Sequence, residues 1–467
     1  MNTNGTIVYN KEYNDAEPKW ELVRDCVKGD KAIKDKGTQY LPKPCAHDNS
    51  QENTIRYSQY KTRAYFMNVV KRTKTALVGS AFFNKPSVDL EPQLEYMLDD
   101  CDGNGLGIIQ KAKQVVGEVT ETGRFGILVD FPRVEGESSK MDIENGARPF
   151  FACYKTEAIA DWRVKRFGAI SKLSAVKLLE QSEMVDEYGF STGEFYDIER
   201  VLYLDDEGFY AQKVTGNDQE AIYEPLDANG NRFRQIPFQF IGSENNDYTV
   251  DESLLYDLAV LNVAHYRNSA DYEESVFKVG QAMLAIYTDN GEDDLSGDFA
   301  FGSSNALLLA QGDKAEILQA KPNLLVENAK NMKLQEMKAI GAKLITPTKQ
   351  QTAEAARIEH GAEVASISTV SENVSDALTK CLAFADMMLS TNPSFDNAFI
   401  MSNEFFFTAM DATMRKTWIE DVMAGNVTKE DYWAALRESR LLPETRKDED
   451  IADDLINEAP SIVFDGE

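Results

Sequence analysis

Hydrophobic residues recur at steps of three and four positions over much of the chain, the spacing that places them on one face of a helix. The longest such pattern predicts a single helix over residues 353–389. Its apolar positions are Val364, Ile367, Val370, Val374, Leu378, Cys381 and Ala385. Further helices are predicted over 51–80, 106–121, 252–278, 323–345, 409–424 and 428–440. Thr428 and Asp431 have the spacing of a capping box at the start of the last one.

Short runs of β-branched and aromatic residues, bounded by turn formers, predict strands. The clearest run covers 125–131 and is stopped by Pro132. Residues 148–240 are expected to be mainly β, with helices inserted and with strands at 198–204, 209–214 and 235–241. Two more strands, at 281–288 and 305–319, fall between the predicted helices 252–278 and 323–345. Pro347 disfavours helix at the residue before it, so a break at 346–352 precedes the longest helix. The chain is therefore expected to be α+β.

Composition narrows the class of protein. The 467 residues allow two to four domains, and 43% hydrophobic with 27% charged residues fit an ordered globular chain. Because no run of about 18 apolar residues occurs, no membrane-spanning helix is expected. The polar N-terminus lacks an apolar signal core, which makes export unexpected. The five cysteines are scattered singly, so neither a disulfide framework nor a structural zinc site is predicted, and a reducing interior is the default compartment.

The balance of charge is strongly acidic. Lys and Arg number 49 against 78 Asp and Glu, a formal net charge of −29. Such a chain is not expected to coat DNA by neutralising phosphates, but its like charge would let DNA slide past without sticking. The final segment, 444–467, holds nine acids and two bases and is expected to be mobile.

Two stretches are basic, in contrast to the acidic chain as a whole. Residues 53–75 hold six basic residues, three tyrosines and no acid. This pattern fits either a nucleic-acid face or, as the favoured interpretation, a helix face that pairs with acidic neighbours. Residues 321–349 hold six lysines and two glutamates, a net charge of +4. That stretch is either a soluble helix surface or a phosphate-facing strip that would slow a polyanion without trapping it.

Few residues suggest catalysis. Residues 100–105 fit the first half of a calcium loop, but Lys111 stands where a bidentate Glu is needed. A tight turn is therefore favoured, with Gly103 and Gly105 at positive φ. Asp130 follows a hydrophobic strand, and Arg124 is its expected ion-pair partner. His265 and His360 lack a nominated catalytic partner and are interpreted as buried or interfacial.

Six blocks of sequence, in order, resemble one known family. They are Tyr60, Arg63, Ala64, Asn68, Gly79 and Pro86; 102–105 (DGNG); 122–132 (TGRFGILVDFP); 148–150 (RPF), Tyr154 and 161–163 (DWR); 236–238 (IPF) leading to 258–272 (LAVLNVAHYRNSADY); and 341–345 (GAKLI) with 352–357 (TAEAAR). These blocks resemble the portal, or head-to-tail connector, proteins of tailed bacteriophages, within a subfamily first catalogued as a phage domain of unknown function. The chain departs from the family at Glu252-Ser253, where Pro-Pro is usual, and at Gln281-Ala282, which replaces Gln-Pro.

The resemblance implies a portal-type fold with a wing, a two-helix stem, a β clip, a tunnel loop, a long wing helix and a short helical crown. The implied parts are an N-terminal polar segment at 1–50, the wing at 51–251, stem helices at 252–278 and 323–345, the clip at 279–322, the tunnel loop at 346–352, the long wing helix and its return at 353–408, the crown at 409–443 and an acidic tail at 444–467.

The resemblance also implies the function. It implies a ring, normally a dodecamer, at the portal vertex of the virion, assembled in the host cytoplasm, through which double-stranded DNA is packaged and ejected. The implied partners are further copies of the chain, the terminase large subunit, a head-completion or adaptor protein, and the major capsid and scaffolding proteins, with no membrane. No catalytic residue, cofactor or metal is implied, because in this family the terminase hydrolyses ATP.

The implied sites fall in two groups. Those facing the DNA channel are Lys330, Lys333, Lys338, Lys343, Thr348, Lys349, Gln350 and Gln351. Those of the clip, where partners would dock, are Asp289, Asn290, Glu292, Asp293 and Asp294. Two alternatives stay open: an intracellular metal-dependent hydrolase using Asp100, Asp102 and Asp130, and a non-portal virion scaffold or adaptor.

Overall fold

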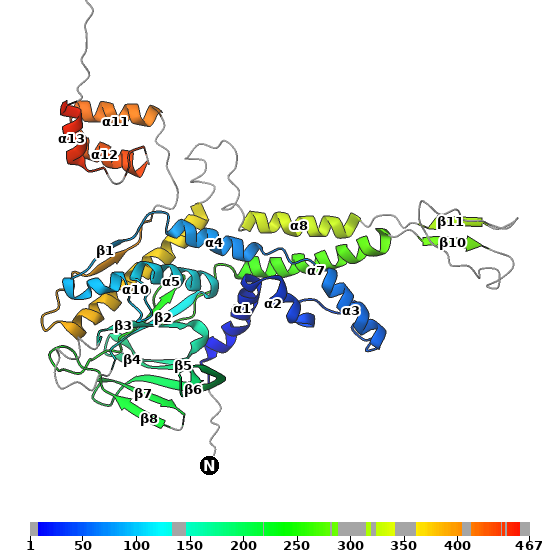
Figure 1. Cartoon of the computed structure of the whole chain (residues 1–467), viewed down its shortest axis with the longest axis horizontal. Coiled ribbons are helices and arrows are strands. Elements are labelled where there is room, and N and C mark those ends of the chain that lie inside the picture. Colours follow the sequence, from blue (N-terminus) through cyan, green and yellow to red (C-terminus); the bar gives the residue numbers. More distant parts are fainter. Residues whose placement is uncertain are drawn as a thin grey trace, which may run out of the picture. The chain divides into compact units, whose positions relative to one another are not determined.

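A computed structural model describes residues 8–132, 146–217, 219–280, 283–287, 314–318, 324–340, 361–403, 412–439, 441–443 and 446–457 (Figure 1). The chain forms two compact units. Unit 1 comprises residues 1–76, 120–123 and 252–346, and unit 2 comprises 77–119, 124–251 and 347–467. Both helices and sheets are present, so the fold is α+β as expected. No helix among the described residues has the length and apolar content needed to cross a bilayer.

The N-terminal part of unit 1 is helical, whereas the sequence pattern had predicted no element there. Helix α1 covers Lys11–Lys28, α2 covers Asp30–Asp35, and a 3₁₀ turn, η1, covers Gly37–Gln39. Pro18 lies inside α1, where it removes a hydrogen bond. The helix persists because Trp20, Val23 and Cys26 bury one face, and α1 contacts α7 (Tyr256–Gly280). The polar composition of residues 1–50 gave no indication that these side chains are buried.

Glycine is required where α1 ends. Gly29 has a φ of +97°, a backbone conformation that L side chains rarely adopt. A Cβ at this position would also lie 2.7 Å from Nδ2 of Asn68, which donates to the backbone oxygen of Val27 at 3.2 Å. The turn between α1 and α2 is therefore closed by a side chain from another part of the unit.

The single helix predicted over 51–80 is two helices, α3 (Gln51–Arg63) and α4 (Val69–Ala81). The cause is Asn262 on α7, which is fully buried. Its Oδ1 accepts from the backbone N–H groups of Val69 and Val70 at 3.2 and 3.4 Å, and its Nδ2 donates to the backbone oxygen of Met67 at 2.9 Å. A side chain some 190 residues away thus caps the start of α4.

The rest of unit 1 follows the predicted order of helix, two strands and helix. Helix α7 (Tyr256–Gly280) is followed by β10 (Met283–Tyr287), β11 (Lys314–Leu318) and α8 (Leu324–Ile340). The two strands are antiparallel, with Ala285 opposite Glu316. Helix α8 packs along α7 (Figure 1) and buries Met337. The two helices and the first strand expected at these positions are confirmed within a few residues. Of the second strand, expected at 305–319, residues 314–318 are confirmed and 305–313 lie outside the described residues.

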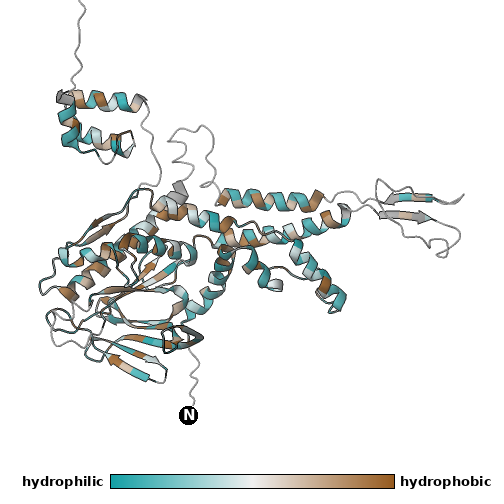
Figure 2. Ribbon diagram, viewed as in Figure 1, coloured by the Kyte–Doolittle hydropathy of each residue, from teal (hydrophilic) through white to brown (hydrophobic). Residues whose placement is uncertain are grey.

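Unit 2 is built on a three-stranded antiparallel sheet in the order β3-β2-β9. These strands cover Phe150–Lys155, Arg124–Asp130 and Phe238–Gly242. All seven residues of the central strand, β2, are buried. Helix α10 (Gly361–Leu389) contacts β2 and β9, and hydrophobic residues recur along α10 and β2 (Figure 2). Six positions of the predicted stripe are buried: Ile367, Val370, Val374, Leu378, Cys381 and Ala385.

The second sheet of unit 2 is a five-stranded antiparallel meander, β4-β5-β6-β7-β8. Its strands cover Ile159–Phe167, Ile170–Val185, Ser191–Leu204, Tyr210–Gly216 and Gln219–Tyr223. The expectation of helices inserted in 148–240 is wrong for the described residues, which hold only the 3₁₀ turn η3 (Thr156–Ala158) there. An antiparallel meander with one face in solvent needs strands in which polar and apolar residues alternate.

Smaller elements complete unit 2. Strands β1 (Ser87–Asp89) and β12 (Ala398–Ile400) pair antiparallel. The 3₁₀ helix η2 (Pro92–Leu98) precedes helix α5 (Ile108–Thr122), which lies close to its predicted position at 106–121. Near the C-terminus are α11 (Ala412–Ala424), α12 (Lys429–Glu438) and α13 (Asp448–Asn457).

Two C-terminal expectations have different outcomes. The capping box of Thr428 and Asp431 is confirmed, since the two residues bond reciprocally at the start of α12. The expectation that the whole acidic tail is mobile is wrong for α13. Ile451 is buried there, Arg437 pairs with Asp448, and three acids in the first turn suit the helix dipole.

We predict that Asn262→Ala lowers the free energy of unfolding by about 2 kcal/mol, because it leaves buried backbone groups at the start of α4 without partners. Urea unfolding followed by circular dichroism measures this. Asn328→Ala on α8, at an exposed position, is the matched control and is expected to change stability by less than about 0.5 kcal/mol. Equal stability of the two variants would contradict the capping role of Asn262.

Candidate functional site

The predicted channel residues lie on or after α8. Lys330, Lys333 and Lys338 are on α8, and the other five, Lys343, Thr348, Lys349, Gln350 and Gln351, lie outside the described residues. The Nζ of Lys330 is 3.5 Å from the centre of the Tyr272 ring on α7, a cation–π contact. Lys333 pairs with Glu336 at 2.8 Å, and Lys338 is exposed.

These three lysines do not form one stripe. At about 100° per residue, Met337 lies on the same face as Lys330, and Met337 is fully buried. Lys333 and Lys338 then fall on opposite sides of that buried face. Of the three, Lys338 is therefore the one whose charge is most available to a ligand. The predicted clip residues, Asp289, Asn290, Glu292, Asp293 and Asp294, lie between β10 and β11, outside the described residues.

His265, on α7, is buried as expected. Burial, together with the positive charge of Lys330, lowers the pKa of its imidazole. The ring is therefore neutral at pH 7 and belongs to the packing of α7 with α8. His360 lies outside the described residues.

The basic stretch at 53–75 pairs with acidic neighbours inside unit 1, which confirms the favoured interpretation. Arg56 and Arg63 on α3 both contact Glu274 of α7. Lys74 on α4 pairs with Glu121, which also pairs with Arg24 at 3.0 Å. Three of the six basic residues of this stretch are therefore held in ion pairs.

Glu274 shows how well these pairs compensate for burial. Its burial alone would raise the pKa of the carboxyl group, but hydrogen bonds from Lys278 and Arg63 outweigh that effect and lower it. Tyr60, also on α3, donates to Asp271 at 2.6 Å. The α3 surface toward α7 is thus a polar packing surface and is not free to bind phosphates.

The loop at 100–105, in unit 2, is the predicted tight turn. Gly103 and Gly105 have φ of +73° and +82°. Asp102 accepts from the backbone N–H groups of Asn104 at 3.0 Å and Leu106 at 3.3 Å, and its other oxygen pairs with Lys111 at 2.6 Å. The lysine at the twelfth position therefore neutralises the loop in place of a calcium ion.

The remaining carboxylate of this turn is also occupied. Asp100 accepts from the N–H of Gly105 at 2.9 Å and pairs with Arg148 at 2.6 Å. Burial tends to raise the pKa of Asp102, but the bond from Lys111 and the backbone N–H groups lower it overall. Within the described part of the chain, no group of three or more His, Cys, Asp or Glu residues could hold a metal ion.

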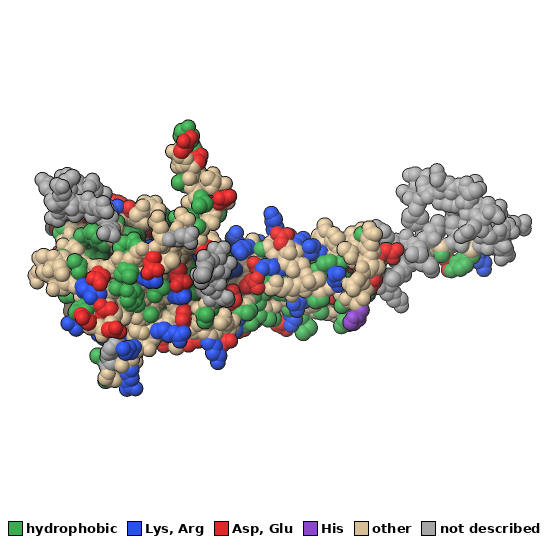
Figure 3. All heavy atoms as spheres, turned by 90° about the horizontal axis from the view of Figure 1, so that it is seen from below, with side chains coloured by type: hydrophobic (Ala, Val, Ile, Leu, Met, Phe, Trp, Pro, Cys, Tyr) green, Lys and Arg blue, Asp and Glu red, His purple; other side chains and the backbone are tan. Residues whose placement is uncertain are grey.

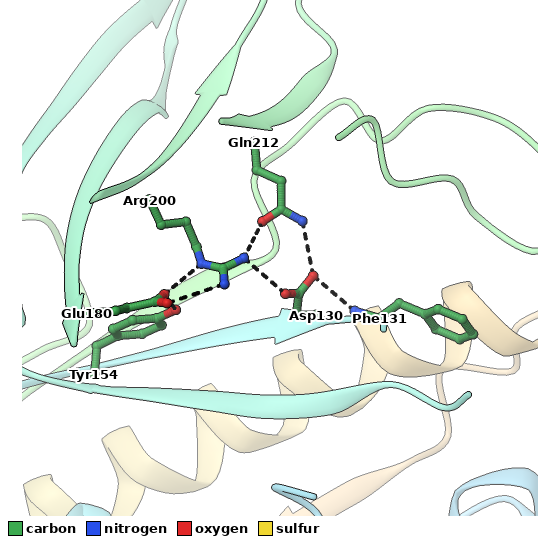
Figure 4. Close-up of polar contacts among 6 residues, drawn as sticks. All are labelled: Asp130, Phe131, Tyr154, Glu180, Arg200 and Gln212. Carbon is green, nitrogen blue, oxygen red and sulfur yellow. Dashed lines mark hydrogen bonds and ion pairs between the residues drawn. The ribbon is translucent and has the colours of Figure 1, made fainter. Parts of the chain in front are cut away.

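Asp130 belongs to a buried polar network that joins the two sheets of unit 2 (Figure 4). Arg200, on β6, lies at its centre. Its Nη1 is 3.4 Å from Oδ2 of Asp130 at the end of β2 and 2.9 Å from Oε1 of Gln212 on β7. Its Nε is 2.6 Å from Oε1 of Glu180 on β5, which also accepts from the hydroxyl of Tyr154 on β3 at 2.6 Å.

The expected pairing of Asp130 with Arg124 is wrong. Both residues are on β2, but six positions along a strand span about 20 Å, too far for contact. The Arg124 guanidinium instead stacks on Trp162 and Phe240, at 3.9 and 4.1 Å from the ring centres. The sequence alone could not identify Arg200 as the partner, because it comes 70 residues after Asp130 and contacts it from a strand of the other sheet.

The electrostatics of the network favour a structural role. Burial raises the pKa of Asp130, and Arg200 opposes the rise without cancelling it. Burial also acts to lower the pKa of Arg200, but the bond to Glu180 and neighbouring acidic groups raise it overall, so the guanidinium stays charged. Both oxygens of Asp130 are occupied, since Gln212 and the N–H of Phe131 donate to Oδ1 at 3.2 and 3.0 Å. The network is a cross-link between strands.

A cavity of about 590 Å³ adjoins this network. It is lined by Phe131, Pro132, Gln212, Ile222, Tyr223, Glu224, Pro225, Leu226 and Met388. Glu224 pairs with Arg232 at 3.2 Å, and Gln212 is held by Asp130 and Arg200. The lining brings together no nucleophile, base and acid, so it does not resemble a catalytic centre.

The cysteines are also poor nucleophiles. All five are free thiols; Cys26, Cys101 and Cys381 are buried, Cys153 is half-buried and Cys45 is exposed. Burial raises the pKa of Cys26, Cys101 and Cys153 to about 12 in each case. The buried thiols are therefore protonated near neutral pH.

One part of the chain matches the model of a described family. Residues 254–388 match the model of "Domain of unknown function (DUF4055)". This match contains α7, β10, β11, α8 and most of α10. It also contains the 258–272 block, the most specific part of the portal resemblance. No match was found among curated proteins.

Three solved structures are similar to the chain along most of its length. A chain from "Virion of native gene transfer agent (GTA) particle" has 11% identity and a TM-score of 0.44, over 86% of this chain and 98% of that one. A chain from "Neck of empty GTA particle computed with C6 symmetry" has 10% identity and a TM-score of 0.43, over 81% and 92%. A chain from "Neck of native GTA particle computed with C12 symmetry" has 12% identity and a TM-score of 0.42, over 79% and 89%.

We predict that Arg200→Met lowers the free energy of unfolding by about 3 kcal/mol at pH 7, because it leaves the buried Asp130 and the half-buried Glu180 without their cation. A carboxyl group with a raised folded-state pKa binds more protons in the folded state. The free-energy cost of keeping its charged form buried is therefore absent at low pH, and this cost grows as pH rises through the folded pKa. The deficit of Arg200→Met is accordingly expected to shrink on acidification.

Urea unfolding at pH 7 and at pH 5 tests both parts of this prediction. Arg163→Met, at an exposed arginine on β4 that pairs only with Asp161 two residues before it, is the matched control and is expected to be nearly neutral. A deficit of the same size at both pH values would argue against the protonation of Asp130.

Proposed function

We propose that the chain is the subunit of a portal ring at one vertex of a tailed-phage capsid. The observation that carries the proposal is the order α7, β10, β11, α8 and α10. Two helices that pack together, α7 and α8, flank a two-stranded ribbon in the sequence. A 29-residue helix, α10, follows them. The portal resemblance implies this same order as stem helix, clip, stem helix and long wing helix. A scaffold or adaptor of another kind would have no reason to keep it.

The acidic charge of the chain explains how DNA could pass through the proposed ring. A formal charge of −29, repeated around a ring, makes a channel wall that repels DNA, so the duplex passes through without adhering. Lysines on and after α8 then supply local contacts to phosphate. At physiological salt such contacts act over only about 8 Å, so they would retard or centre DNA without holding it.

The partners follow from the same assignment. The ribbon β10–β11 and the acidic segment between its strands, with Asp289, Asn290, Glu292, Asp293 and Asp294, form the proposed docking site for the terminase large subunit and then for a head-completion protein. The helices α11 and α12 form the proposed crown. The protein would have no catalytic activity, cofactor or metal of its own. The virion vertex is its proposed location.

The hydrolase alternative has less support. It needs Asp100, Asp102 and Asp130 to share a metal ion. Each of these carboxylates instead has its own cation, Arg148, Lys111 and Arg200 respectively. Metal analysis of the purified protein would distinguish the two functions, since the hydrolase requires bound metal in a stoichiometric amount.

Native mass spectrometry with negative-stain imaging tests the ring directly. We expect a species near twelve times 52.4 kDa, seen as a ring with a central hole. A monomer that stays monomeric when mixed with capsid and scaffolding proteins would contradict the proposal.

The channel lysines give a second prediction. Lys349→Glu places an acid at the proposed narrowest point of the channel and is expected to reduce the amount of DNA packaged and retained, because phosphate contacts are replaced by repulsion. Packaged DNA per particle is the readout. Lys416→Glu, at an exposed position on α11, is the control and should package normally. Unchanged packaging and retention in Lys349→Glu would remove the channel role of this residue.

A further inference from the structure

The hairpin of β5 and β6 extends beyond the rest of its sheet. Strand β4 pairs with β5 only as far as Leu178, and β7 pairs with β6 only from Ile198. Residues 179–197 therefore form a two-stranded arm, in which, among the described strands, β5 and β6 pair only with each other. An isolated two-stranded hairpin is marginally stable, and its open edges can pair with another chain.

The arm exposes large hydrophobic side chains. Val185, Tyr188, Phe190 and Phe195 are 59%, 77%, 72% and 61% exposed. Single exposed apolar residues are common, but a group of them at the end of one hairpin is typical of an interaction surface. Figure 3 shows such a projection, tipped with green and red side chains and without blue ones.

The end of the arm is closed by its own hydrogen bonds. Oδ1 of Asp186 accepts from the N–H groups of Tyr188 and Phe190 at 2.9 and 2.8 Å. The hydroxyl of Thr192 donates to the backbone oxygen of Met184 at 2.9 Å. These bonds define the turn that carries Tyr188 and Phe190.

The arm has a complement on the same chain. It holds five exposed acids, Glu183, Asp186, Glu187, Glu194 and Asp197, and no base; a sixth acid, Glu180, pairs with Arg200. The basic turn, defined as residues 163–172, comprises the end of β4, the connection to β5 and the start of β5. It holds four bases, Arg163, Lys165, Arg166 and Lys172, and no acid, and Arg163 also pairs with Asp161 at 3.0 Å. This basic turn also exposes two apolar side chains, since Val164 is 42% and Ile170 is 61% exposed.

The arm and the basic turn cannot meet within one copy. They lie at opposite ends of β5, a strand of 16 residues that spans about 50 Å. Each copy therefore carries an acidic, aromatic surface at one end and a basic surface with apolar residues at the other. Such a pair of different, complementary patches gives head-to-tail association, which closes into a ring when the rotation between copies allows it.

We propose that the arm of one copy docks on the basic turn of the next copy, with opposite charges steering the contact and the arm's aromatic residues packing against Val164 and Ile170. The ring in which this contact would operate rests on the proposed function. Nucleic acid is a poor partner for the arm, because an acidic surface repels phosphates.

Charge reversal on each side tests the contact. The arm variant is Glu183→Lys with Glu187→Lys, the turn variant is Arg166→Glu with Lys172→Glu, and the fourfold variant combines them. Native mass spectrometry over a protein dilution series gives the concentration at which half the protein is assembled. We expect each twofold variant to raise that concentration about tenfold or more and the fourfold variant to restore most of the loss. Glu420→Lys with Glu430→Lys, at exposed positions on α11 and α12, is the control.

A cross-link keeps the test decisive if a charge variant folds poorly. Tyr188→Cys on the arm and Ala169→Cys in the turn, in a Cys45→Ser background, are expected to give a ladder of disulfide-linked oligomers on mild oxidation. Either substitution alone should give no ladder beyond a dimer.

The outcomes separate this contact from the portal assignment. Wild-type rings that are insensitive to charge reversal and form no ladder would overturn the arm contact alone. A ladder without closed rings would support the contact and contradict the proposed ring. Wild-type protein that stays monomeric and forms no ladder would contradict both. Loss of DNA binding without loss of assembly would assign the basic turn to nucleic acid and overturn the contact.

Discussion

Unit 1 depends on α7 being held by its neighbours at several different points along its length. Asn262 caps α4, Asp271 accepts from Tyr60 of α3, Tyr272 lies under Lys330 of α8, and Glu274 pairs with Arg63. Because these directional contacts point to different helices, α7 cannot rotate about its axis or slide without breaking several of them. The position of α7 relative to its neighbouring helices in unit 1 is therefore fixed by these contacts.

The sequence predicted elements whose signal is local. The α10 stripe, the buried strand β2 and the capping box at Thr428 all follow from residues a few positions apart. The same holds for the turn at 100–105, where glycines and short-range acids are enough to predict the geometry. What could not be predicted was set by distant residues. The break between α3 and α4 depends on Asn262, and the partner of Asp130 is Arg200. The packed helix α1 was hidden by its polar composition.

The charged residues of the chain fall into two groups, those paired inside a unit and those exposed on its surface. Three of the six basic residues of the 53–75 stretch are paired with acids inside unit 1, and the charges around Asp130 are paired inside unit 2. Such buried pairs contribute specificity more than stability, since desolvation offsets much of the attraction. Lys338 on α8 is exposed, and the two ends of β5 carry charges of opposite sign. The sequence predicted a helix at 323–345, and Lys330, Lys333 and Lys338 lie on α8 there, but their role in a channel stays a prediction.

The burial of the thiols has a consequence for the chemical durability of the protein. Burial raises the pKa of Cys26 and Cys101 to about 12, so both thiols stay protonated at pH 7 and react poorly with alkylating agents. Cys45 is exposed instead. A thiol-specific dye is therefore expected to label the folded chain first at Cys45.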